Sequence, residues 1–149
     1  MKKALFIPFA LLLLTACDDS PVFPLEPEIQ FVSITPSVAT EFTADEIKLT
    51  IHYQDGDGDL GYEGDPTKNL FIEDRRAAFA ADSARFTSYS FASLTPETRK
   101  PSIQGEISVL LTTPPYEPTE EPLVFGVYIV DRAGNRSNVV ESTAIEVRQ

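Results

Sequence analysis

The sequence has no tryptophan, a single histidine and a single cysteine. One cysteine cannot form a disulfide within the chain, so a folded domain must be stabilised by its own core or by a ligand. The GxSxG pattern of serine hydrolases and the HExxH pattern of zinc proteases are both absent from the sequence. The one histidine, His52, falls on the expected outward face of a strand. We therefore predict no enzymatic activity, and so few soft ligands argue against a transition-metal site.

Basic residues are also scarce. Twelve Lys and Arg residues stand against 23 Asp and Glu residues, which gives a formal net charge of −11. This acidic balance argues against nucleic acid and against an anionic lipid surface as partners, because like charges repel. Metal cations and basic proteins remain open as partners. The 12 prolines are spread along the chain and argue against long helices.

Only one apolar run is long, and it lies at the N-terminus. Lys2 and Lys3 precede the run Ala4–Leu14, which has about half of the roughly 20 residues that a transmembrane helix needs. Such a run after two lysines is typical of a secretory signal peptide. Residues 14–17 (LTAC) resemble the lipobox of bacterial lipoproteins. The resemblance implies that residues 1–16 are removed and that Cys17 is lipidated. The alternative is an ordinary secretory signal with a cysteine nearby.

Residues 17–27 (CDDSPVFPLEP) combine prolines with acids and predict a stiff, acidic tether. Lipidation gives the only cysteine a role, and two or three acyl chains anchor a protein stably to a lipid bilayer. Asp18 and Asp19 directly after Cys17 resemble two opposite sorting signals. One retains lipoproteins in the inner membrane of enteric bacteria, and the other accompanies export to the cell surface in Bacteroidota-type lipoproteins. A merely solvated acidic tether is the third interpretation.

From residue 28 onward the apolar residues alternate with polar ones, which is typical of half-buried strands. The clearest case is residues 46–53 (EIKLTIHY). Its expected inward side chains are Ile47, Leu49, Ile51 and Tyr53. The predicted strands are 28–34, 46–53, 68–73, 86–91, 102–112, 123–131 and 139–147.

One short helix is expected among these strands. Residues 75–85 (RRAAFAADSAR) are rich in alanine, and Asp74 is placed to cap a helix there. About seven strands joined by short turns predict a single all-β domain over residues 28–149, an antiparallel β-sandwich of immunoglobulin-like type. A jelly roll or a small barrel is the alternative.

The segment with the most chemistry follows the second predicted strand. Asp55, Asp57 and Asp59 alternate with glycines in DGDGDLG, and glycines let the backbone fold so that the carboxylates converge. A hard cation such as Ca²⁺ relieves the repulsion between them, with Glu63 and Asp65 as further candidate ligands. The segment is not an EF-hand, because it lacks the glycine and the glutamate that the EF-hand loop requires at its sixth and twelfth positions. The alternative is a loop whose aspartates only stabilise turns.

A second polar segment, residues 131–138 (DRAGNRSN), joins the last two predicted strands. Gly134 and Asn135 suit positive φ, so a structural hairpin is the simplest interpretation. In a seven-strand immunoglobulin-like order this loop lies at the same end as DGDGDLG. Asp131 is therefore a further candidate metal ligand, or a residue that supports the ligands. The start of the first strand, and with it the tether, falls at this end too.

The lipobox with DGDGDLG and VDRAGNRSN resembles Bacteroidota-type lipoproteins that carry immunoglobulin-like domains. The resemblance implies an envelope location, with the chain anchored in the outer membrane at its periplasmic face or at the cell surface. It leaves the protein or glycan partner open. Our first hypothesis is a calcium-stabilised binding, adhesion or accessory module. The alternatives are a metal-free structural lipoprotein of a cell-envelope complex and a hydrolase that uses the acidic loop residues.

Overall fold

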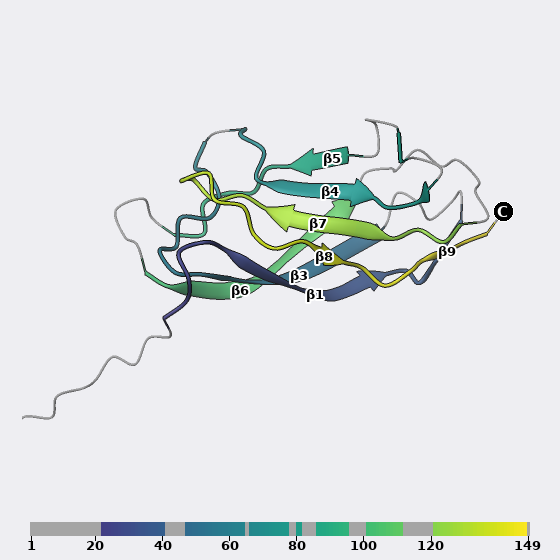
Figure 1. Cartoon of the computed structure of the whole chain (residues 1–149), viewed down its shortest axis with the longest axis horizontal. Helices are drawn as coiled ribbons and strands as arrows, with labels where there is room; N and C mark the ends of the chain where they lie inside the picture. Colours follow the sequence, from purple (N-terminus) through teal and green to yellow (C-terminus); the bar gives the residue numbers. More distant parts are fainter. Residues whose placement is uncertain are drawn as a thin grey trace, which may run out of the picture.

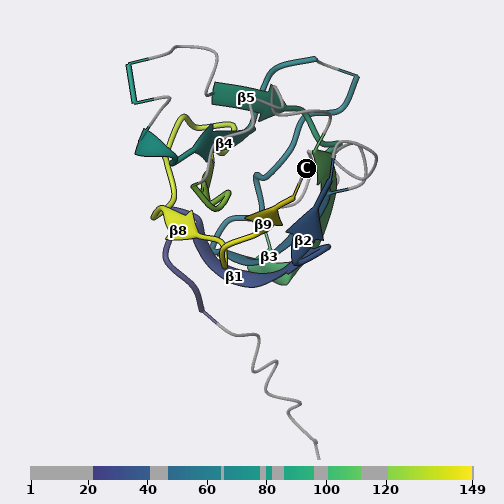
Figure 2. The ribbon, with the colours of Figure 1, turned by 90° about the vertical axis from the view of Figure 1, so that its right-hand side faces the viewer.

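The computed structural model describes residues 22–40, 47–64, 66–77, 80–81, 86–95, 101–111 and 121–148. These residues form two packed layers of strands, which Figure 1 shows from the side and Figure 2 from one end. The predicted signal peptide, Cys17, and Asp18 and Asp19 lie outside the described residues. Within the described part of the chain, no helix has the length and apolar character needed to cross a membrane.

The strands cover most of the segments in which the sequence alternates. They are β1 (Glu28–Thr35), β2 (Val38–Ala39), β3 (Ile47–Asp55), β4 (Leu70–Asp74), β5 (Phe86–Tyr89), β6 (Ile103–Leu111), β7 (Phe125–Ile129), β8 (Val140–Glu141) and β9 (Glu146–Val147). The first layer is β1-β3-β6, and the second is β5-β4-β7-β8. Both layers are antiparallel, whereas β2 and β9 form a short parallel pair beside them.

The core lies between the two layers. In β3 the alternate residues Ile47, Leu49, Ile51 and Tyr53 are all buried, as the sequence predicts. The second layer contributes buried side chains at Leu70, Ile72, Phe125, Val127 and Ile129. The polar residues that alternate with the buried ones of β3 lie on its other face, and one of them is buried as well. Thr50 is only 5 % exposed, and its hydroxyl lies 2.9 Å from that of Ser108 on β6.

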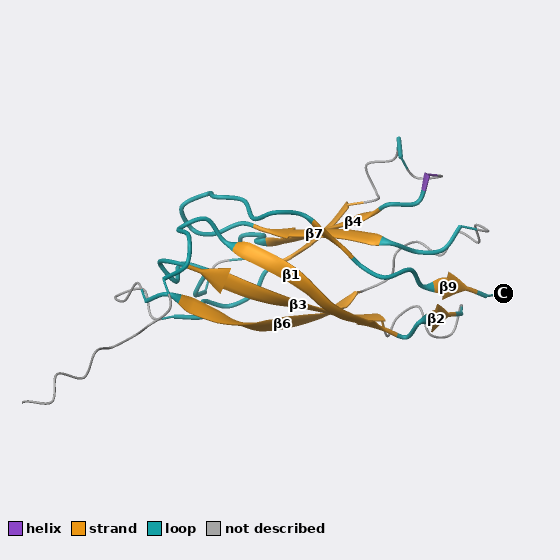
Figure 3. Cartoon of the chain, turned by 60° about the horizontal axis from the view of Figure 1, so that its bottom comes forward, coloured by secondary structure: helices purple, strands orange, loops and turns teal. Residues whose placement is uncertain are grey.

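The strand order confirms the predicted antiparallel β-sandwich. The first, second and fifth long strands form one layer, and the third and sixth lie together in the other, as in immunoglobulin-like domains. β2 was not among the predicted strands, and residues 139–147 contain two short strands instead of one. Figure 3 shows β2 and β9 side by side, near the C-terminal end of the described chain.

The helix predicted over residues 75–85 is not seen in the part of this segment that the structure describes, and residues 78–79 and 82–85 lie outside the described residues. No α-helix occurs among the described residues, which include 75–77 and 80–81 of this segment. Asp74 belongs to β4, and its Oδ1 accepts the backbone N–H of Arg76 (3.0 Å) as a capping residue would. The same carboxylate also binds the buried Arg76 guanidinium, with Nη2 to Oδ2 at 2.6 Å. This ion pair draws the side chain into the sandwich, and a tight turn from Ala80 N–H to Ala77 C=O follows.

Three segments meet at one end of the sandwich, on the left in Figure 1. They are the first described residues before β1, the loop after β3, and the loop between β7 and β8. The described chain ends at the opposite end. The predicted arrangement of the two polar loops is therefore confirmed, and this end holds the candidate metal centre.

Candidate metal centre

The aspartate loop, residues 55–61, brings three carboxylates together directly after β3. One carboxylate oxygen from each of Asp55, Asp57 and Asp59 lies within 4.8 Å of the others. Asp55 is the last residue of β3 and pairs with Ile103 of β6, so the first layer fixes its position. The alternation of aspartates with glycines predicted this convergence. These three side chains can hold a metal ion.

Glycine is required at two turns of the loop. Gly58 and Gly61 have φ of 64° and 79°, a region that side chains other than glycine rarely adopt. A Cβ at Gly61 would also collide with the backbone of Ala92. Gly58 turns the chain between Asp57 and Asp59, and Gly61 turns it again after Asp59.

Five backbone carbonyl groups of the aspartate loop accept hydrogen bonds from neighbouring segments. The hydrogen bonds run from Ser102 Oγ to Gly56 O (3.0 Å), Thr95 Oγ1 to Gly58 O (2.5 Å), Arg132 N to Asp59 O (3.2 Å), Leu94 N to Leu60 O (3.1 Å) and Arg132 Nη1 to Gly61 O (2.8 Å). This support comes from residues far along the sequence, which no local pattern predicts. The hydrogen bonds connect the loop backbone to the segments around it.

Asp55 is the most unusual residue of the cluster. It is 0 % exposed, and neither of its carboxylate oxygens accepts a hydrogen bond from any described residue. Burial, together with the smaller effects of the charges of Asp57, Asp59 and Asp131, raises the pKa of Asp55 from 3.8 to about 6. The backbone amide of Asp59 opposes this with a smaller lowering of the pKa, although it falls outside hydrogen-bonding geometry. A buried, uncompensated carboxylate is costly, so a positive charge beside Asp55 would stabilise the folded chain.

A pH dependence of stability follows for the metal-free protein. The folded chain binds the Asp55 proton more tightly than the unfolded chain, because the folded pKa is about 6 instead of 3.8. The resulting stabilisation is fully present below pH 3.8 and is lost as the pH rises through about 6. In chelator, wild type should therefore gain about 1 kcal/mol relative to Asp55→Asn on going from pH 7 to pH 5. Urea unfolding of both proteins at the two pH values measures this difference. An unchanged difference would show that Asp55 titrates normally.

The remaining predicted ligands lie in different surroundings. Asp131 is 0 % exposed and close enough for its charge to raise the pKa of Asp55. It lies outside the group of three that converges within 4.8 Å, and its two carboxylate oxygens accept Asn135 N (2.7 Å) and Asn135 Nδ2 (2.8 Å). Gly134 has the predicted positive φ, 88°. Glu63 is exposed and lines a separate shallow groove with residues 92–95. Asp65 lies outside the described residues.

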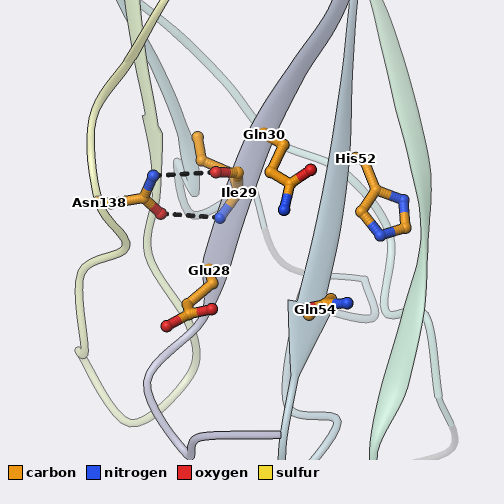
Figure 4. A pocket seen from close by; sticks show the side chains of 6 residues that line it. All are labelled: Glu28, Ile29, Gln30, His52, Gln54 and Asn138. Carbon is orange, nitrogen blue, oxygen red and sulfur yellow. Dashed lines mark hydrogen bonds between the residues drawn. The ribbon is translucent and has the colours of Figure 1, made fainter.

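A second polar site lies on the outer face of the first layer, beside the aspartate loop. It is a groove of about 370 Å³ lined by Glu28, Ile29, Gln30, His52, Gln54 and Asn138. Figure 4 shows His52 pointing outward from β3, as the sequence predicts. The side-chain amide of Asn138 accepts from Ile29 N (2.8 Å) and donates to Ile29 O (2.9 Å). Asn138 therefore takes the place of a strand partner for β1, and this wall of the groove is structural.

Comparison with known proteins adds no relative. No family model, curated protein or solved structure matches the chain. The residues of the centre themselves are therefore the basis for its proposed chemistry.

Proposed function

We propose that the chain is a membrane-anchored lipoprotein whose β-sandwich binds Ca²⁺ in the aspartate loop and acts as a binding, adhesion or accessory module of the cell envelope. The lipobox pattern that ends at Cys17 supports the anchor. The observation that carries the cation is the Asp55 carboxylate, fully buried beside two others and without a hydrogen-bond donor among the described residues. A bound cation supplies the charge that this group needs.

Calcium is the cation that best fits the donor set. The cluster offers carboxylate oxygens, and none of its three members is a histidine or a cysteine, which favours a hard cation. Ca²⁺ accepts six to eight oxygens in flexible geometry, whereas Mg²⁺ demands a near-ideal octahedron. Asp57 is partly exposed, so water can complete the coordination. Calcium sites of extracellular modules bind at about 10⁻⁴–10⁻³ M.

The proposed role of the ion is to fix the loop end of the domain. Asp55 ends β3 in the first layer. The backbone carbonyl of Asp59 accepts a hydrogen bond from the backbone N–H of Arg132, which lies in the loop after β7. An ion that holds both aspartates therefore joins the two layers of the sandwich at this end. A partner would then meet a rigid surface instead of loops pushed apart by repelling carboxylates.

Thermal melts of the full-length chain in detergent test the proposal. In 2 mM Ca²⁺ and with a dissociation constant near 0.1 mM, linkage gives about 1.8 kcal/mol of stabilisation over chelator. This corresponds to a rise of about 5 °C in Tm for a domain of this size. Mg²⁺ at the same concentration should give a smaller rise.

Two variants make the melt specific to the loop. Asp57→Asn removes a ligand and should abolish the calcium-dependent rise. Glu141→Gln removes the same charge from an exposed position on β8 and should retain the rise. If wild type melts at the same temperature in calcium and in chelator, the aspartates only stabilise turns, and the chain becomes a metal-free structural lipoprotein.

A further inference from the structure

The segment that precedes β1 lies directly on the aspartate loop. The pairing of Glu28 with Gln54 brings residue 27 level with Asp55, and Pro27 is fully buried there. We refer to residues 22–27 as the N-terminal strap. Its contact with the loop is at Gly56, between two of the clustered aspartates. A Cβ at Gly56 would collide with the carbonyl oxygens of both Phe23 and Pro24.

Gly56 is held on two sides. Its carbonyl accepts the Ser102 hydroxyl at 3.0 Å, while its α-carbon faces the strap backbone. The φ of Gly56 lies outside the left-handed region, so its backbone does not itself require glycine. The close approach of the strap does require it. The structure therefore uses glycine at this position to seat the strap.

We propose that the aspartate loop is a cation-dependent seat for the N-terminal strap, so that Ca²⁺ controls whether the strap is held against the domain. This inference rests on the proposed calcium site and extends it to regulation. Without a cation, Asp55 and Asp57 repel each other, and Gly56, which lies between them, moves with the loop. The strap then loses the surface on which its two carbonyl groups rest.

The consequence concerns the point from which the tether leaves the domain. When the strap is seated, the tether departs beside the metal centre. When it is released, the chain is free from residue 22 up to the start of β1 at Glu28. The cation would therefore set both the effective length of the tether and the orientation of the domain above a bilayer. Linkage is reciprocal, so unseating the strap should in turn weaken calcium binding.

The absence of tryptophan makes the seat directly measurable. The variant Phe23→Trp places the only tryptophan of the chain in the strap, at a residue that is partly buried. We expect acrylamide to quench its fluorescence at least about twofold less in 2 mM Ca²⁺ than in chelator, because the seated ring is shielded. Calorimetric titration of the same protein with Ca²⁺ reports binding independently.

Two second-site variants distinguish loss of the contact between the strap and Gly56 from a general destabilisation of the domain. Gly56→Ala in the Phe23→Trp background should give strong quenching in both conditions and lower the calcium affinity about tenfold. Gly64→Ala is the matched control: it strains the backbone just after the aspartate loop, at φ of 69°, but no described atom lies within 4 Å of its added Cβ. It should retain the calcium-dependent shielding.

The outcomes distinguish the inference from the proposed function. Calcium binding with calcium-dependent shielding supports both. Calcium binding with equal quenching in calcium and chelator overturns the seat and leaves the metal site standing. No heat of binding overturns the metal site, and the cation-dependent seat with it.

Discussion

Asp55→Asn is expected to reverse the order of thermal stability between calcium and chelator. In chelator at pH 7, wild type carries a buried carboxylate whose pKa is raised to about 6, and the variant replaces it with a neutral amide of the same shape. The amide can donate to its carboxylate neighbours. The variant should therefore exceed wild type in unfolding free energy by about 2 kcal/mol.

In 2 mM Ca²⁺ the order should invert. Wild type gains about 1.8 kcal/mol or more, according to its affinity, whereas the variant has lost a charged ligand and gains little. Paired melts of the two proteins, each with and without calcium, measure the effect as a cycle. Glu63→Gln serves as the control, because Glu63 is exposed and lies outside the cluster. A variant less stable than wild type in chelator would mean that the Asp55 carboxylate is already compensated without a metal.

The second large effect concerns the buried ion pair at the end of β4, between Asp74 and Arg76. The Arg76 and Asp74 side chains are 2 % and 7 % exposed, and their charged atoms approach to 2.6 Å. Arg76 Nε also donates to both carboxylate oxygens, at 3.1 and 3.0 Å. Arg76→Ala leaves the Asp74 charge buried without its guanidinium, which should cost about 3–5 kcal/mol of unfolding free energy.

The double variant Arg76→Met with Asp74→Leu should recover most of this loss, because it leaves no uncompensated charge. Arg148→Ala is the matched control. Arg148 pairs with Glu146 at 2.8 Å, but both side chains are 66 % exposed, so the loss should not exceed about 1 kcal/mol. Urea unfolding of the four proteins measures the comparison. Equal losses for Arg76→Ala and Arg148→Ala would contradict the structural role assigned to the buried pair.

Period-two alternation was enough to predict the layered fold. It located β3 because inward Ile, Leu and Tyr side chains recur at every second residue over the whole strand. It could not locate β2, which has two residues and therefore no period. The alanine-rich segment after β4 was predicted as a helix from local propensity. At the described start of this segment Arg76 is buried in an ion pair with Asp74, a tertiary effect that local propensity does not include.

The candidate site could be predicted only in part. The spacing of Asp55, Asp57 and Asp59 predicts convergence, because the glycines between them permit tight turns. The spacing does not predict the hydrogen bonds that other segments make to the carbonyl groups of the loop. Thr95 binds Gly58 across 37 residues of sequence, and Ser102 binds Gly56 across 46. No local pattern marks a serine or threonine for such a contact.

The amide of Asn138 also closes part of a strand edge. An open strand edge invites lateral strand addition by a neighbouring molecule and aggregation. At Ile29 both the N–H and the C=O are already occupied by a residue 109 positions away. A neighbouring molecule therefore cannot extend the sheet through Ile29. One side chain, without an additional strand, protects this point of β1.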